Sequence, residues 1–168
     1  CAPGTFTNST NQWECMPCSP GEWQDASGQT ACKDCTAGNY CPDGASTPLP
    51  CPATRYASAT NNNEAGTDCD LCPAGAFCST GSVTPTNCSA GTISAAGADQ
   101  CSPCTGGTYQ DEEGMTECKA CVAGSYCPAG AAAALPCLAT TYSSATDNDE
   151  PTDCSECPAG AFCSTGST

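Results

Sequence analysis

Large apolar residues are spaced regularly along the 168-residue chain, with polar, Gly-rich and Pro-rich segments between them. Nine of the ten aromatic residues, and one isoleucine, stand five positions after a cysteine, and these segments recur about every 17 residues. The set is Phe6, Trp23, Tyr40, Tyr56, Phe77, Ile93, Tyr109, Tyr126, Tyr142 and Phe162. The pattern predicts a brief extended segment in each repeat, whose large side chain covers the disulfide beside it.

A turn is predicted just before each extended segment. Glycine, which readily adopts positive φ, stands three positions after the first cysteine of the repeat, except at Thr54 and Thr140. Helix is expected to be nearly absent, because Pro and Gly are frequent and the Ala-rich stretch 129–136 is predicted to be a loop ended by Pro136. The fold class is therefore small and disulfide-rich: an elongated tandem array of modules with short β-ribbons, each with its own core of one disulfide and one ring.

The second cysteine of each module defines three module types. It follows the first by 13–14 residues in a plain module, by six in a short one and by 17–18 in a long one. The order plain, plain, short, long, short occurs twice, which predicts two five-module units, 1–87 and 88–168. The string CPAGAFCSTGS stands at both 72–82 and 157–167, which indicates a building block of the array. We expect the sequence to be an excerpt of a longer repeat protein.

Composition shows why disulfides would be needed. The chain has 20 cysteines but only ten Leu, Ile, Val and Phe residues in total, far fewer than a packed domain contains. Such a chain cannot bury enough apolar area to offset the entropy of ordering its backbone, so covalent bonds must hold it. Disulfides persist in oxidising compartments, which predicts an extracellular or cell-surface location.

The charge excludes two classes of partner. The formal net charge is −15, and only three residues carry positive charge. Nucleic-acid binding requires clustered Lys and Arg, as does polybasic contact with a membrane. No apolar run approaches the 18 residues of a membrane span, so no direct membrane insertion of this segment is expected.

Six Cys-x-x-Cys pairs raise the possibilities of zinc binding and thiol redox chemistry. The chain has no histidine, and the pairs fall where one module meets the next, so structural disulfides are the favoured interpretation. No catalytic constellation is present, and the carboxylates lie on polar loops without an apolar pocket that would raise a pKa. We therefore expect no enzyme activity and no cofactor.

Calcium is the more serious metal candidate. The loop at 147–156 carries Asp147, Asp149, Glu150 and Asp153, and hard cations prefer several oxygen ligands. The equivalent loop of the first unit has lost much of this charge, which favours a solvated loop over a calcium site.

Surface modification is also predicted. Two N-glycosylation sequons begin at Asn8 and Asn87, the second beside Cys88, whose disulfide would compete with modification. Numerous Ser and Thr residues are possible carriers of O-linked glycans. Trp13, the one aromatic residue outside the regular positions, is interpreted as stabilising its loop, with an exposed contact residue as the alternative.

The string CTGGTYQDEEGMTECKAC at 104–121 resembles the ephrin-receptor-like cysteine-rich repeat (GCC2/GCC3 type), and CTAGNYCPDGASTPLPC and CPAGAFC resemble shortened variants of it. The pattern is also similar to tumour-necrosis-factor-receptor ectodomain modules. By composition it resembles protist surface proteins and components of flagellar hairs. These resemblances imply an elongated, disulfide-ribbed extracellular protein without catalysis.

Two connectivities remain open. Sequential pairing joins the two cysteines of each module; interlocked pairing, as in receptor-type modules, would join for example Cys35 to Cys51 and Cys41 to Cys69. The sequential scheme, which we prefer, pairs Cys1 with Cys15, Cys18 with Cys32, Cys35 with Cys41, Cys51 with Cys69, Cys72 with Cys78, Cys88 with Cys101, Cys104 with Cys118, Cys121 with Cys127, Cys137 with Cys154 and Cys157 with Cys163.

The sequence favours a structural protein: a rod-like part of a surface coat, matrix or filament, of the flagellar-hair or surface-antigen type. Its expected partners are other copies of itself or other surface and filament proteins. The alternative is a ligand-binding or adhesion ectodomain of a receptor, which would be expected to have one distinctive module, and none stands out.

Overall fold

The computed structural model describes residues 1–8 and 14–168. Within them, regular structure consists of two-residue β-strands and one 3₁₀ turn, η1 (Pro151–Asp153), so helix is almost absent, as predicted. The strands are β1 (Thr5–Phe6), β2 (Met16–Pro17), β3 (Glu22–Trp23), β4 (Lys33–Asp34), β5 (Asn39–Tyr40), β6 (Leu49–Pro50), β7 (Arg55–Tyr56), β8 (Asp70–Leu71), β9 (Ala76–Phe77), β10 (Thr86–Asn87), β11 (Thr92–Ile93), β12 (Ser102–Pro103), β13 (Thr108–Tyr109), β14 (Lys119–Ala120), β15 (Ser125–Tyr126), β16 (Leu135–Pro136), β17 (Thr141–Tyr142) and β18 (Ser155–Glu156).

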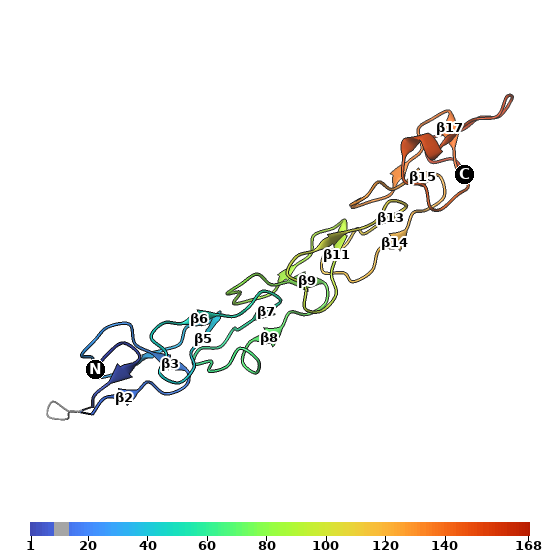
Figure 1. The fold of residues 1–168 in the computed structure, drawn as a ribbon. Helices are drawn as coiled ribbons and strands as arrows, with labels where there is room; N and C mark the ends of the chain where they lie inside the picture. The colour runs from blue at the N-terminus through green and yellow to red at the C-terminus, as the bar shows by residue number, and fades with distance from the viewer. Residues whose placement is uncertain (9–13) are drawn as a thin grey trace. The chain divides into compact units, whose positions relative to one another are not determined.

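The strands form two-stranded antiparallel ribbons that recur along the chain (Figure 1). In each ribbon, the first strand holds the residues four and five positions after the module's first cysteine. The second strand holds the two residues before the next module's first cysteine; Tyr40, for example, pairs with Leu49, and Tyr126 pairs with Leu135. Several second strands end in proline, which an edge strand tolerates because the missing N–H is not needed for a ladder. The predicted small, disulfide-rich class of tandem repeats with short β-ribbons is confirmed.

The predicted turn is present in every module. All eight predicted glycines have φ between +76° and +88°. Thr54 and Thr140, which replace glycine in the two long modules, adopt the same conformation, with φ of 82° and 79°. A β-branched residue rarely has positive φ, so the surrounding structure holds these two threonines in a strained conformation.

The core consists largely of disulfides, and it is shared between neighbouring modules. Three clusters of buried residues each join a disulfide, a buried alanine and a partly buried ring. In each cluster the ring belongs to the preceding module: Trp23 packs against Cys35 and Cys41, Tyr40 against Cys51 and Cys69, and Tyr109 against Cys121 and Cys127. The prediction of a separate core for each module was wrong in these clusters. The ring covers the next disulfide because its ribbon ends beside the next module.

The fold divides into two compact units. The first consists mainly of residues 1–73 and the second mainly of residues 100–168, and the segments within 74–99 belong partly to one unit and partly to the other. In both units the ribbons and loops have the same construction. Among the described residues, the structure contains no helix of the length and apolarity needed to cross a bilayer.

Candidate functional site

All twenty cysteines form disulfides, and each disulfide joins two cysteines of one module. This is the sequential arrangement. The two cysteines of a Cys-x-x-Cys pair therefore belong to different disulfides; Cys15 pairs with Cys1, whereas Cys18 pairs with Cys32. The short-module disulfides close loops with a sequence separation of six, and their α-carbons lie 5.8–5.9 Å apart, within the ordinary range.

The feature that repeats most faithfully is the junction between one module and the next, which consists of backbone hydrogen bonds. The amide three positions after a module's first cysteine donates to the carbonyl six positions after the next module's first cysteine; the first such bond is Gly4 N–H to Gln24 O (2.7 Å) and the last is Thr140 N–H to Cys163 O (3.0 Å). The carbonyl of the same residue accepts from the amide of the next module's first cysteine, as in Cys18 N–H to Gly4 O (2.9 Å). Both bonds occur at all nine junctions.

Two further bonds complete the junction. The amide six positions after a first cysteine donates into the loop of the following module, as Gln24 N–H does to Ala45 O (3.1 Å). At eight junctions a loop amide donates back to the carbonyl of the preceding module's first cysteine, as Gly44 N–H does to Cys18 O (2.9 Å). Because backbone groups make these bonds, the junction forms between modules of different sequence.

Glycine is required in the turn for a second reason besides its φ. At seven of the eight turn glycines, an added methyl group would meet a loop carbonyl oxygen of the next-but-one module; the distance would be 2.3 Å from Gly4 to Gly44 O and 1.9 Å from Gly75 to Gly114 O. Gly160, in the last module, has nothing within 4 Å of this position. Each such module therefore lies against the two modules that follow it.

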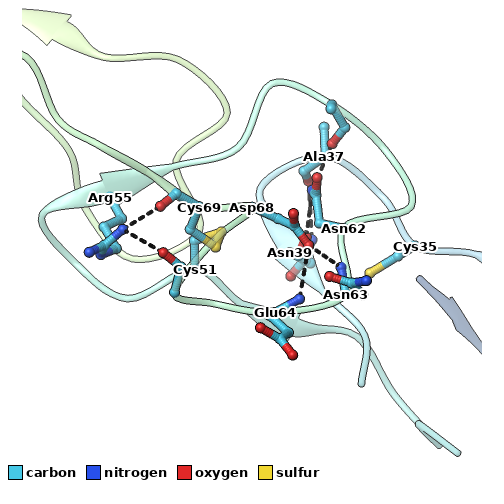
Figure 2. Close-up of a disulfide and its surroundings, with 12 residues drawn as sticks. Cys35, Ala37, Asn39, Cys51, Arg55, Asn62, Asn63, Glu64, Asp68 and Cys69 are labelled. Atoms are coloured by element: carbon cyan, nitrogen blue, oxygen red, sulfur yellow. Dashed lines mark hydrogen bonds between the residues drawn. A yellow bond between two sulfur atoms is a disulfide. The ribbon is translucent and has the colours of Figure 1, made fainter. Parts of the chain in front are cut away.

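The long modules contain a buried amide that the sequence interpretation missed. Asn62 is 5% exposed, and its Nδ2 donates to Asn39 O (2.9 Å) in the preceding module and to Ala59 O (2.8 Å) in its own loop (Figure 2). Asn148, in the equivalent place, donates to Ser125 O (2.8 Å). These residues fix the long loop to its neighbour. The sequence did contain a signal for these buried amides, because both asparagines stand eleven positions after the first cysteine of their long module. The signal was easily overlooked, since the surrounding loop residues are also polar.

Buried glutamines organise two plain loops in the same way. Gln24 is 3% exposed and Gln110 is 2% exposed. Their side chains donate to Ala31 O (2.8 Å) and Glu117 O (2.7 Å), respectively, and each accepts from a backbone amide two positions later. Each glutamine therefore holds a plain loop closed at the point where the extended segment ends.

The calcium candidate loop directs one carboxylate toward its own backbone. Asp153 Oδ2 accepts from the amides of Glu150 (3.0 Å) and Asp149 (2.9 Å), and these bonds hold the pKa of the Asp153 carboxyl below its ordinary value. Asp68 does the same in the first unit with the amides of Glu64 and Asn63, which lower its pKa. Among the described residues, the structure brings together no group of three or more acidic, cysteine or histidine residues with the geometry of a metal site.

Each of the three cationic residues bonds to a group in its own module. Lys33 lies 2.7 Å from Asp25 Oδ1 and 4.6 Å from the centre of the Trp23 ring, and its hydrogen bond lowers the pKa of the Asp25 carboxyl. Lys119 pairs with Asp111 in the second unit. Arg55 donates to Cys69 O (2.6 Å) beside the Cys51–Cys69 disulfide (Figure 2).

The predicted modification sites lie on the surface where the structure describes them. Asn8 is exposed, but Ser9 and Thr10 of its sequon lie outside the described residues, as does Trp13. Asn87 is exposed on β10, next to the fully buried Cys88.

A family model described as tyrosine-protein kinase ephrin type A/B receptor-like matches residues 4–47 and 91–133, just over half of the chain. The chain belongs to this family. The two matches cover the plain, plain, short series of each predicted unit, the part in which the turn glycine is never replaced. No curated protein matches the chain in a sequence search.

Membership in the ephrin-receptor-like family has two direct consequences. The family is a cysteine-rich receptor-like module and is not a catalytic family. Together with ten disulfides, such repeats indicate an extracellular or surface location for this ephrin-receptor-like chain.

Proposed function

We propose that this chain is an extracellular structural repeat protein that forms a rod-like part of a cell-surface coat, matrix or filament. One observation carries the proposal: the same pair of backbone hydrogen bonds occurs at all nine junctions. Since each module is joined to the next through its backbone, the array extends without a specialised module, which is how solenoid-like repeat proteins propagate.

The disulfides suit such a chain to carry tension. The ten disulfides close loops that together take up about 110 residues, so reduction would lengthen a fully stretched chain by roughly 330 Å. Pulling single oxidised molecules, with and without reductant, measures this difference. Equal contour lengths would contradict the mechanical role.

The surface is suited to regular spacing of neighbours. Two of the three cations are paired with adjacent carboxylates, so most of the formal charge of −15 remains on exposed loops and repels other acidic surfaces. Glycans at Asn8, Asn87 and exposed Ser and Thr residues would add to this separation; intact-mass measurement of native material before and after deglycosylation tests for them.

The family description, which names a receptor, favours a second candidate: a ligand-binding or adhesion ectodomain. Electron microscopy of native material distinguishes the two functions. Immunogold labelling on ordered surface layers or filaments is expected for the structural role. Isolated molecules that bind one soluble ligand, with no labelled assembly, would refute it. Neither proposed function includes catalysis, a cofactor or nucleic-acid binding.

A further inference from the structure

The short modules that begin at Cys35, Cys72 and Cys121 each carry a surface loop that is fixed at both ends. The loop runs from the second cysteine to the second strand of the ribbon and comprises residues 42–48, 79–85 and 128–134. Near its start, a glycine amide donates to the carbonyl of the preceding module's first cysteine: Gly44 to Cys18 (2.9 Å), Gly81 to Cys51 (2.9 Å) and Gly130 to Cys104 (2.8 Å). Its last residue, Pro48, Pro85 or Ala134, is half-buried.

Two exposed residues stand between these anchors. They are Ser46 and Thr47, Val83 and Thr84, and Ala132 and Ala133. Thr47 and Thr84 occupy the same place, six positions after the second cysteine and directly before proline, whereas the third loop has alanine there. Proline disfavours helical backbone at the residue before it, so each threonine favours an extended conformation. Two of the loops thus present a threonine to solvent from a fixed support.

The structure distinguishes these two hydroxyls from other threonine hydroxyls of the chain. Thr92, Thr108 and Thr141 each donate to the carbonyl three residues earlier, at 2.7–2.8 Å. Thr47 Oγ1 lies 3.4 Å from Pro48 O, which is longer than an ordinary O–H···O hydrogen bond. Thr84 Oγ1 has no hydrogen-bond partner within the described residues. Both hydroxyls are therefore free to react with an incoming group.

The two threonines also lie in uncharged segments, although the chain's net charge is −15. No charged residue stands between Asp70 and Asp99, and none stands between Asp43 and Arg55. By contrast, Thr152 Oγ1 in the acidic loop 147–156 lies 3.4 Å from a carboxylate oxygen of Glu150. Activated sugar donors carry phosphate, and neighbouring carboxylates repel a negatively charged donor. This repulsion is weakest in segments such as those around Thr47 and Thr84.

We propose that Thr47 and Thr84 are O-glycosylated. Exposed extracellular segments rich in Ser, Thr and Pro are typical carriers of O-linked sugar, and residues 79–86 contain five Ser or Thr residues and one Pro. Threonine Oγ1 attacks the anomeric carbon of a phosphate-activated sugar, which a glycosyltransferase of the secretory pathway supplies. The new C–O bond forms as the bond from the anomeric carbon to the donor phosphate breaks, and the hydroxyl proton passes to a base of the transferase.

Mapping of modified residues on native protein, by fragmentation mass spectrometry, tests the proposal. After enzymatic removal of N-linked glycans, which eliminates any sugar on Asn87, peptides that cover 42–50 and 79–87 should still carry sugar, on Thr47 and Thr84. Mild alkaline elimination should release it. Thr92, Thr108 and Thr141, whose hydroxyls donate to the backbone, should carry none. Absence of sugar from Thr47 and Thr84, or equal modification of the hydrogen-bonded threonines, would overturn the proposal.

The third loop allows a gain-of-function variant. In a secretory host that glycosylates the unaltered chain, Ala133→Thr combined with Ala134→Pro should add sugar to residues 128–136, a segment that otherwise has no Ser or Thr. Ala132→Thr with the same proline is the matched control, because residue 132 is also exposed but does not precede the proline; it should gain none. A double variant at 133 and 134 that gains no sugar would contradict the assignment.

Loss-of-function variants complete the test in the same host. Thr84→Ala should abolish the O-linked sugar on residues 79–87. Thr92→Ala, which removes a hydroxyl that donates to Ser89 O, should leave the total sugar mass unchanged. Sugar that persists on residues 79–87 in Thr84→Ala would show that another hydroxyl is the acceptor and would overturn the assignment of Thr84.

The inference rests on the proposed structural function, because it specifies where glycans separate the array from its neighbours, but the two fail separately. Unmodified threonines on a chain that still labels ordered surface assemblies would remove the two acceptor sites alone. Sugar at Thr47 and Thr84 on a chain without any labelled assembly would remove the structural function alone.

Discussion

The turn glycines allow the cost of close module packing to be separated from the cost of positive φ. Gly75 and Gly160 lie in identical eleven-residue stretches and have φ of 81° and 82°. An alanine at Gly75 would place its methyl group 1.9 Å from Gly114 O, whereas at Gly160 nothing lies within 4 Å. Gly160→Ala is therefore a control matched in both sequence and conformation.

The expected magnitudes differ clearly. Gly160→Ala should destabilise its module by about 1–2 kcal/mol, the cost of a left-handed conformation for an L-residue. Gly75→Ala must also displace Gly114, which disturbs Gly75 N–H to Ser94 O and Gly114 N–H to Cys88 O. With about 0.5–1.5 kcal/mol for each bond, the total becomes about 2–5 kcal/mol.

Native-state hydrogen exchange is the suitable assay, because a repeat array need not unfold in one step. In Gly75→Ala, exchange of the Cys78 and Gly114 amides should accelerate, by about tenfold for each 1.4 kcal/mol. In Gly160→Ala, the Cys157 and Gly166 amides, which donate to Thr140 and Cys137, should accelerate much less. Equal acceleration in the two variants would refute the claim that next-but-one packing requires glycine.

Three other predictions follow from burial and hydrogen bonding. Limited reduction with alkylation and mass spectrometry should open Cys1–Cys15, whose Cys15 is exposed, before the fully buried Cys35–Cys41 disulfide; labelling of Cys35 first would contradict this order. Asn62→Ala should cost about 1–3 kcal/mol, because it removes the buried Asn62 amide and leaves the partly buried Asn39 carbonyl without its donor. Limited proteolysis within 59–68 should accelerate, with Asn63→Ala as the exposed control, and equal cleavage of the two variants would refute the role of the buried amide. The folded-state pKa of Asp153 is lowered, so its stabilisation of loop 147–156 should be complete above the unfolded pKa of about 3.9 and lost as pH falls through the folded value. Amide exchange of Asp149 and Glu150 should therefore accelerate in acid, and Asp153→Asn should remove this pH dependence. Exchange that does not respond to acid in the unaltered chain would contradict the prediction.

The module could be predicted from the order of the amino acids. Cysteine spacing defined ten segments. The single large residue marked the short strand in nine of them, although Phe162 lies in none of the strands of the described residues, and glycine marked the turn in eight. These features are local. A single glycine is enough to indicate a turn that needs positive φ, and a chain poor in Leu, Ile, Val and Phe requires covalent bonds in order to fold. The ribbon register follows from the same spacing, because the second strand directly precedes the next cysteine.

The contacts between residues of different modules became evident only in the tertiary structure. Trp23 covers the disulfide of the next module, Asn62 bonds to the preceding one, and Gly75 lies against the carbonyl of the next but one. Asp153 is turned toward its own loop backbone. No spacing rule reveals these choices, because they depend on how neighbouring modules pack, and backbone hydrogen bonds between modules of different side chains make that packing.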